Sequence, residues 1–304
     1  YTYHFNNFFN VGMNDYVDNG VYKIPQLQPE FKEFVTLMNE WYEEGLLDQE
    51  YDTNDGTIVD AKMTNGTSGV TYGFIGGTIG KYVNAMKDRD PNYKLAAAPF
   101  PSPIDGSEAR FSECQHEANN PHLAITGNCP DPAAAAKWAD YVYSEEGNVL
   151  KNFGVEGETF NLVDGHYVYT DEILNNPEGL SIAEAMGKHF RANSPSPGFC
   201  QMEDYLNQYY QLQEQKDALP MWAEYTANAR ETVVPPITLT LDESEEIAAI
   251  SAEVDTYKKE MVLKFIKGLE PMENYDAFVE TLKSMGADRL TEIYQGALDR
   301  YYQR

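Results

Sequence analysis

A hairpin signal near the middle of the chain constrains the local fold most strongly. Residues 160–170, FNLVDGHYVYT, contain two short runs rich in β-branched and aromatic residues, with Asp164 and Gly165 between them. Asp-Gly suits the centre of a type I′ turn, where both residues adopt a positive φ. The segment therefore predicts two short antiparallel strands, preceded by a helix that ends at Gly154.

Most other periodic segments have the spacing of amphipathic helices. In residues 28–51 the apolar side chains recur at helical intervals, and Gly45 follows as the expected stop. These apolar residues are Phe31, Phe34, Val35, Met38, Trp41 and Tyr42. Further helices are expected within 181–190, 202–219, 221–234 and 241–267, and in two closing segments separated by Gly286. We expect Pro220 to break the chain between two of these helices.

Two helix starts have clear capping residues. Asp131 is placed to cap a helix with Pro132 at its first position, and Trp138 and Tyr141 on one face of that helix are expected in the core. The long helix that ends at Gly268 is expected to start at Thr240 or Asp242 and carries acidic residues in its first turn, which suits the helix dipole.

Strand signals are few and short. We expect strands at residues 70–72, at the start of 93–100 and at 122–126, and a helix that ends near Met86 after the Gly76-Gly77 turn. Three prolines in residues 99–103 are expected to order a crossover between lobes. Few strands among many helices indicate an α/β or α+β class.

The composition bounds the class of partner. The chain has 304 residues, enough for two domains, and a net charge of −27. This charge argues against nucleic acid and anionic lipid as partners, because both require clusters of Lys and Arg. The sequence contains no run of 18 apolar residues that would predict a membrane-spanning helix. Cys114, Cys129 and Cys200 lack the spacing of a zinc site, and we expect free thiols, although a bridge between two of them stays open.

Catalytic and metal-binding motifs were sought and not found. The five histidines form no HExxH pair, and the stretch DTNDGTIVD at residues 52–60 lacks the ligand alternation and the final Glu of a calcium loop. No nucleophile motif or phosphate loop occurs. We therefore expect no catalytic residue, metal or cofactor, although the 49 acidic residues leave a carboxylate pair for glycoside hydrolysis open.

Several aromatic residues lie near turns and helix breaks, where flat rings suit stacking on sugar faces. They are Tyr72, Phe74, Phe199, Trp222 and Tyr225. Packing in the core is the favoured explanation for each of these rings, and stacking on sugar is the alternative.

Five segments, taken in order, resemble the extracellular solute-binding proteins of carbohydrate ABC transporters (family 1, the large lipoprotein type of Gram-positive bacteria). The most specific is residues 124–170, where a helix after CPDP is followed by SEEG, NFGVEG and the Asp-Gly hairpin. The other segments are residues 30–53, 93–101, 235–247 and 264–301.

The resemblance implies a two-lobed, maltose-binding-like fold of the type II periplasmic-binding-protein class, which is α/β and helix-rich. Family members begin with a secretion signal, a lipid-carrying cysteine and most of the first lobe, so the chain is expected to be a C-terminal portion. Residues 1–100 would form the first part of the second lobe, and 101–175 the crossover and the returning segment of the first lobe, including the hairpin at 160–170. Residues 176–304 would contribute the C-terminal helices of the second lobe.

By position, the resemblance also implies three groups of ligand-binding residues. Tyr72 and Phe74 would stack on sugar at a strand end, where related proteins often have Trp. The segment after the crossover would contribute Gln115, His116 and Glu117, and a helix start would contribute Trp222, Tyr225 and Arg230.

The implied function is a receptor that captures an oligosaccharide in a cleft between lobes and delivers it to the transmembrane subunits of an ABC permease. Such a protein is a monomeric, extracellular lipoprotein at the cell surface and not an enzyme. The alternatives are a glycan sensor or adhesion module without a transport role, a glycoside-active enzyme, and a binder of peptides or cationic solutes.

Overall fold

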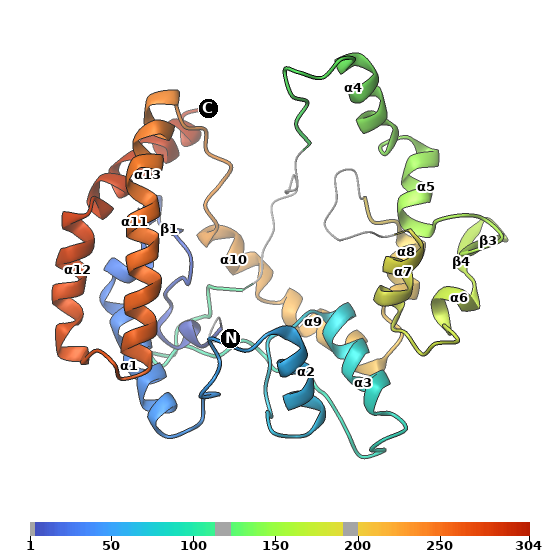
Figure 1. Ribbon diagram of the computed structural model, residues 1–304, viewed down its shortest axis with the longest axis horizontal. Coiled ribbons are helices and arrows are strands. Elements are labelled where there is room, and N and C mark those ends of the chain that lie inside the picture. Colours follow the sequence, from blue (N-terminus) through green and yellow to red (C-terminus); the bar gives the residue numbers. More distant parts are fainter. Residues whose placement is uncertain (1–3, 113–122, 191–199) are drawn as a thin grey trace. The chain divides into compact units, whose positions relative to one another are not determined.

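The computed structural model describes residues 4–112, 123–190 and 200–304 (Figure 1). The chain divides into two compact units, each built from segments that are distant in the sequence. Unit 1 contains Tyr1–Val59, Pro99–His116 and Met221–Arg304. Unit 2 contains Asp60–Ala98 and Glu117–Pro220.

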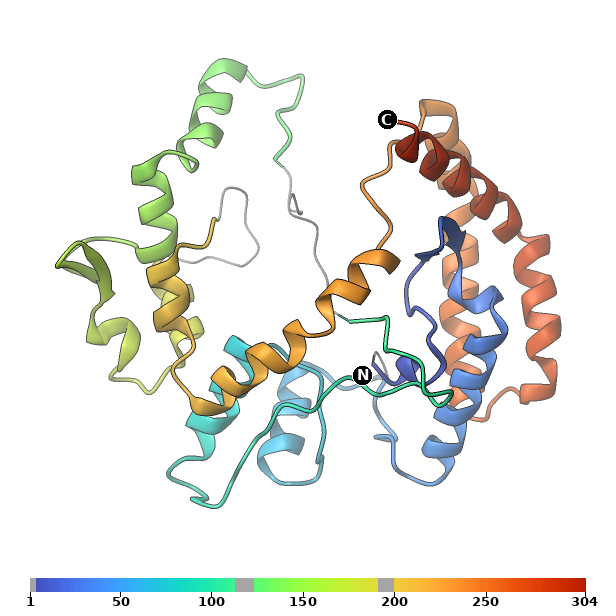
Figure 2. The same cartoon turned by 180° about the vertical axis from the view of Figure 1, so that it is seen from behind.

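Unit 1 is a helical layer packed on a small hairpin. Helix α11 (Leu241–Ile266) packs against α1 (Pro29–Glu43) and against α12 (Tyr275–Ser284) and α13 (Ala287–Tyr302). The hairpin of β1 (Tyr16–Asp18) and β2 (Val21–Lys23) lies beside α13, as the view from behind shows (Figure 2). Shorter elements complete the unit: η1 (Phe5–Phe9), η2 (Pro25–Leu27), α10 (Thr226–Thr232) and η4 (Met272–Asn274).

The helices of unit 1 follow the predicted patterns. Four of the six apolar residues predicted for α1 are buried, and Gly45 follows the helix with a φ of 74°. Helix α11 begins with a capping box between Thr240 and Glu243 and is followed by Gly268 at a φ of 66°. Gly286, at a φ of 108°, separates α12 from α13 as predicted. Each fully buried apolar side chain contributes about 1.5–3 kcal/mol to stability.

Unit 2 contains η3 (a π-helix, Ile75–Ile79), α3 (Gly80–Met86), α4 (Pro132–Tyr141), α5 (Glu145–Phe153), α6 (Asp171–Leu174), α7 (Ile182–His189) and α8 (Glu203–Tyr209). Helices α2 (Gly56–Thr64) and α9 (Gln213–Ala223) each contain one of the four points where the chain passes between the units. The core of unit 2 is formed by eight buried residues: Phe153, Phe160, Tyr169, Ile173, Ala185, Met186, Tyr205 and Tyr209.

The predicted hairpin is confirmed. Strands β3 (Phe160–Val163) and β4 (His166–Tyr169) are antiparallel, with Phe160 opposite Tyr169. Asp164 and Gly165 have φ values of 52° and 86°, as a type I′ turn requires. The hairpin is held to α8 because the Asp204 carboxylate accepts a hydrogen bond of 2.9 Å from the Tyr167 backbone N–H.

The three other strand predictions are wrong in the described residues. Residues 70–72, 93–100 and 123–126 form no strand there, and Val70 is 74% exposed. A strand exists only when a neighbouring strand receives its hydrogen bonds, and β-propensity alone does not supply that neighbour. Within the described part of the chain, the strands form two hairpins, β1–β2 and β3–β4.

Two helix predictions need correction. Asp131 and Pro132 start α4 as predicted, but Trp138 and Tyr141 are 69% and 40% exposed and α4 buries no residue. The helical face that they share has no core to pack on in unit 2. Pro220 does not break the chain, because it lies inside α9; the expected helix over 202–219 is divided earlier, between α8 and α9.

The boundaries of the two units fall at 59/60, 98/99, 116/117 and 220/221, and the packing of the hairpin on α8 joins residues 160–170 to the segment that follows 176. The predicted lobe boundaries at residues 100 and 175 stay predictions. Which unit corresponds to which lobe stays a prediction. No helix among the described residues is both long and apolar enough to cross a bilayer.

Candidate functional site

Tyr72 and Phe74 form an aromatic pair in unit 2. Their ring centroids lie 5.8 Å apart at an interplanar angle of 67°, an edge-to-face arrangement. Phe74 is 69% exposed, although it is a large apolar ring. The pair lies on an extended segment that leads directly into the π-helix η3. π-helical turns occur frequently at functional sites, which makes this segment a candidate.

The turn after the pair is held by short contacts. The backbone N–H of Phe74 donates to the Thr78 hydroxyl at 3.0 Å, and the Thr78 N–H donates to the Phe74 carbonyl at 2.9 Å. Gly73 leaves room for Thr78, because a Cβ on it would lie 2.3 Å from the Thr78 hydroxyl. The Gln215 side-chain amide, which is buried, donates to the Ile75 carbonyl at 3.0 Å. These contacts fix the position from which Phe74 projects.

A polar cavity of about 360 Å³ adjoins this turn. It is lined by Asp60, Gly77, Thr78, Lys81, Tyr82, Ser181, Ala183 and Glu184. Thr78 belongs both to the turn that follows the aromatic pair and to the cavity wall, so this turn connects the two features, although neither ring is itself a lining residue. The cavity lies wholly within unit 2.

The polar groups of the cavity are arranged by their own contacts. Asp60 accepts a hydrogen bond of 2.9 Å from the Tyr82 hydroxyl and forms an ion pair with Lys81. Glu184 accepts a hydrogen bond of 2.9 Å from the Ser181 N–H, and the Ser181 hydroxyl accepts one of 3.3 Å from the Glu184 N–H, which together form the capping box of α7. Carboxylates, a phenol and hydroxyls at such a wall can exchange hydrogen bonds with the hydroxyls of a sugar.

In unit 1 the structure brings a second set of rings together. Tyr225, which precedes α10, packs edge-on against Phe100 at 5.1 Å, and Phe100 packs against His4 at 4.6 Å. The Tyr225 backbone N–H donates to the Trp222 carbonyl at 3.3 Å, so these two predicted residues lie in one turn. Arg230 is exposed on α10. Tyr225 therefore combines a packing role with partial exposure.

The predicted ligand-binding residues and the residues of the candidate site overlap only in part. Gln115, His116 and Glu117 lie outside the described residues. The sequence does not predict Asp60, Lys81 and Tyr82, which meet at the cavity because the Asp60 carboxylate of α2 contacts the Lys81 and Tyr82 side chains of α3. Asp60 is the last residue of the stretch 52–60, which lacks the pattern of a calcium loop.

Asp52, the first residue of that stretch, has another role, in unit 1. Its carboxylate accepts hydrogen bonds of 2.7 Å from the Lys267 ammonium, and this contact lowers the pKa of Asp52. Among the described residues, no group of three or more His, Cys, Asp or Glu side chains is arranged to hold a metal ion. Cys129 and Cys200 are free thiols, as expected, while Cys114 is not among the described residues.

Residues 2–149 match the family of bacterial extracellular solute-binding proteins. A curated protein of Niallia circulans, named as an uncharacterized protein in the butB 5′ region, is 26% identical over 273 residues. That alignment covers 86% of this chain and 96% of the Niallia protein.

Two solved structures are similar over almost the whole chain. The alginate-binding protein AlgQ2, crystallised without calcium ion, aligns with a TM-score of 0.78 at 23% identity, covering 98% of this chain and 62% of AlgQ2. The ABC-transporter substrate-binding protein FusA of S. pneumoniae, in complex with kestose, aligns with a TM-score of 0.71 at 19% identity, covering 99% of this chain and 60% of FusA. The chain thus spans less than two thirds of both solved proteins. The likeness confirms the predicted α/β fold of the type II periplasmic-binding-protein class.

Proposed function

We propose that the chain is a bacterial extracellular solute-binding protein, because residues 2–149 match that family, and that it binds an oligosaccharide. In this proposal it acts outside the cell as a receptor and carries out no covalent chemistry. The family is named for binding a solute, and the names of AlgQ2 and FusA describe binding proteins as well.

The observation that carries the proposal is the aromatic pair beside the polar cavity. A sugar ring has an apolar face of C–H groups and an edge of hydroxyls. Phe74 would receive the apolar face, while Asp60 and Tyr82 would receive the hydroxyls. Because the turn is already held by Thr78 and Gln215, little conformational entropy would be lost on binding.

The charge of the chain favours a neutral sugar over an acidic one. A net charge of −27 repels a polyanion such as alginate, and Lys81 is already paired with Asp60 in the cavity. We therefore propose a neutral oligosaccharide as the ligand. In unit 1, Trp222, Tyr225 and Arg230 are proposed as sugar-contacting residues in their own right.

Delivery of the sugar to the transmembrane subunits of an ABC permease is part of the same proposal. So are the monomeric state and the lipid anchor at the cell surface. FusA is named as an ABC-transporter protein, which supports this assignment by analogy of fold.

A ligand panel tests the proposal. The chain is incubated separately with maltoheptaose, kestose and an alginate oligosaccharide, and binding is followed by saturation-transfer NMR, which detects weak complexes. We expect transfer to a neutral sugar and a smaller signal for alginate. Mass spectrometry of the same samples should return intact sugars. Shortened products would identify an enzyme, and transfer to alginate alone would contradict the neutral ligand.

A further inference from the structure

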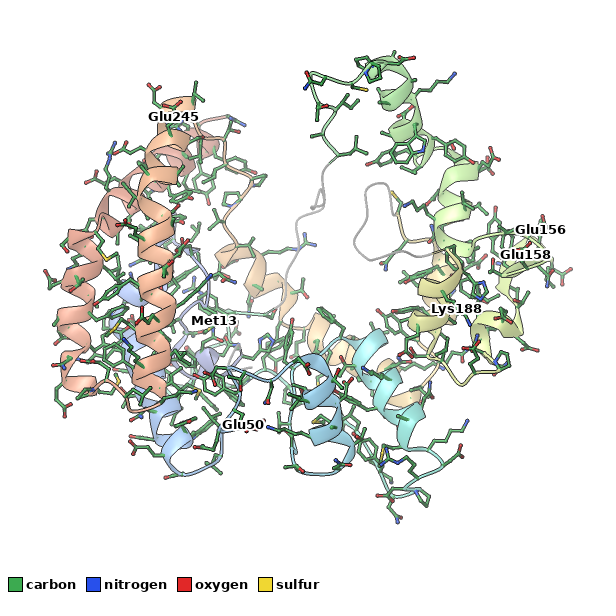
Figure 3. All side chains as sticks on the ribbon, in the orientation of Figure 1. Met13, Glu50, Glu156, Glu158, Lys188 and Glu245 are labelled. Atoms are coloured by element: carbon green, nitrogen blue, oxygen red, sulfur yellow. The ribbon has the colours of Figure 1, made fainter. Side chains whose placement is uncertain are left out.

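A second cavity of unit 2, of about 780 Å³, lies between the corner of α4 and α5 and the β3–β4 hairpin. Its wall contains three carboxylates, Glu145, Glu146 and Glu156, and no Lys, Arg or His. It shares no residue with the cavity beside Phe74. Figure 3 shows Glu156 on the loop that leads into the hairpin. We call this surface the acidic groove, formed by Tyr141, Glu145, Glu146, Leu150, Val155 and Glu156.

The acidic groove also presents apolar side chains to solvent. Tyr141, Leu150 and Val155 are 40%, 42% and 49% exposed. Trp138 lies one turn before Tyr141 on the same face of α4 and is 69% exposed. Exposed apolar side chains that continue from a helix into a groove and are bordered by charge are typical of an interaction surface.

The shape of the groove is fixed by two glycines. A Cβ on Gly147 would lie 2.1 Å from the Tyr141 carbonyl, so only glycine permits this close corner between α4 and α5. Gly154, at a φ of 84°, likewise makes room for Thr159, whose hydroxyl donates to the Phe153 carbonyl at 2.6 Å. A groove held in this way needs little rearrangement to receive a partner.

We propose that the acidic groove docks a basic segment of a partner protein through an apolar anchor. The three carboxylates complement Lys and Arg side chains, and Leu150 and Val155 receive the anchor. A second copy of this chain is a poor occupant, because each copy has a net charge of −27. This inference does not depend on the sugar ligand.

The test uses the whole chain and a fluorescent amphipathic peptide of Leu and Lys, about 14 residues or roughly four helical turns long. Its counterpart has Glu in place of Lys. Binding is measured by anisotropy at low salt and at about 0.3 M salt, where the screening length is short.

Matched variants locate the binding. Glu146→Lys with Glu156→Lys reverses two charges in the groove, and Glu245→Lys with Glu253→Lys reverses two on exposed residues of α11. Leu150→Ser removes the apolar anchor site, and Leu241→Ser, at a residue 73% exposed on α11, is its control. Circular dichroism checks that each variant folds.

We expect the affinity for the Lys peptide to fall about tenfold in the groove charge variant and about fivefold in Leu150→Ser. The affinity of each control variant should stay within about twofold of that of the original chain. The Glu peptide should not bind. Equal losses of peptide affinity in the groove and control variants would overturn the proposal, because the Lys peptide would then be attracted by the acidic surface of the whole chain and not by the groove. Displacement of the peptide by maltoheptaose would overturn it too and assign the groove to carbohydrate.

Discussion

Phe74 and Thr78 hold each other in place through two hydrogen bonds. The Phe74 N–H donates to the Thr78 hydroxyl at 3.0 Å, and the Thr78 N–H donates to the Phe74 carbonyl at 2.9 Å. The first hydrogen bond is accepted by the Thr78 side chain, so a substitution of Thr78 can remove it and leave the backbone hydrogen bond in place. It links the exposed ring to the wall of the polar cavity, which Thr78 also lines.

Thr78→Val removes this hydroxyl at nearly constant volume. We expect the free energy of unfolding to fall by about 0.5–1.5 kcal/mol, the usual contribution of one hydrogen bond, and sugar binding to weaken because Phe74 is less well held. Thr281→Val is the control, since the Thr281 hydroxyl donates to Ala277 within α12, far along the chain from the site. Equal sugar binding by Thr78→Val and the original chain would show that the turn does not orient the ligand.

Gly76 is predicted to tolerate no side chain. A Cβ on it would lie 2.3 Å from the Tyr209 ring, so Gly76→Ala should lower the free energy of unfolding by about 1–3 kcal/mol through overpacking. Gly77→Ala is the matched control, because nothing lies within 4 Å of a Cβ at Gly77. Urea unfolding measures both. The physical explanation fails if Gly76→Ala and Gly77→Ala have the same stability.

Asp15 gives unit 1 a pH dependence of defined sign. Burial raises the pKa of Asp15 above its ordinary value of 3.8, while the hydrogen bond of 2.6 Å from the Tyr22 hydroxyl opposes the rise. A carboxyl group whose pKa is raised in the folded state makes its full contribution to the free energy of unfolding at pH values below its pKa in the unfolded chain. This contribution is lost as the pH rises through its pKa in the folded protein. The free energy of unfolding of the original chain, relative to that of Asp15→Asn, should therefore fall as the pH rises from below 3.8 towards neutrality.

Thermal unfolding of both proteins across this pH range measures the effect. Asp105→Asn is a control of opposite sign, because hydrogen bonds from Ser107 lower the pKa of Asp105, so its contribution is lost as the pH falls. If the difference in unfolding temperature between the original chain and Asp15→Asn is the same at every pH, the pKa of Asp15 is not raised. Tyr22→Phe should lower the free energy of unfolding by about 1–3 kcal/mol, because it removes the hydrogen bond of the half-buried Asp15 carboxylate with the Tyr22 hydroxyl.

The sequence predicted most accurately those elements whose backbone hydrogen bonds join residues that are near each other in the sequence. Helix α1 follows from the spacing of its apolar residues, and the β3–β4 hairpin follows from Asp164 and Gly165, because a helix and a tight hairpin find their hydrogen-bond partners nearby. The predictions at residues 70–72 and 123–126 failed because a single strand depends on a partner that local sequence does not specify.

The role of the candidate site stays a prediction. The sequence points to Tyr72 and Phe74 because they lie beside a glycine turn, which is a local signal. Asp60 and Lys81 are separated by 21 residues and meet only through the packing of α2 and α3. Trp138 was expected in the core because periodicity indicates which residues share a face of a helix, but not what covers that face.

The most direct test of the central claim compares two aromatic residues of equal exposure. Phe74 and Trp138 are each 69% exposed in unit 2, but only Phe74 is hydrogen-bonded, through its backbone, to Thr78 in the wall of the polar cavity. Saturation-transfer NMR with maltoheptaose and kestose is measured on the original chain, on Phe74→Ala and on Trp138→Ala. The account predicts that Phe74→Ala loses most of the transfer and that Trp138→Ala keeps it. Retention of the full signal by Phe74→Ala would contradict the assignment of this site to carbohydrate.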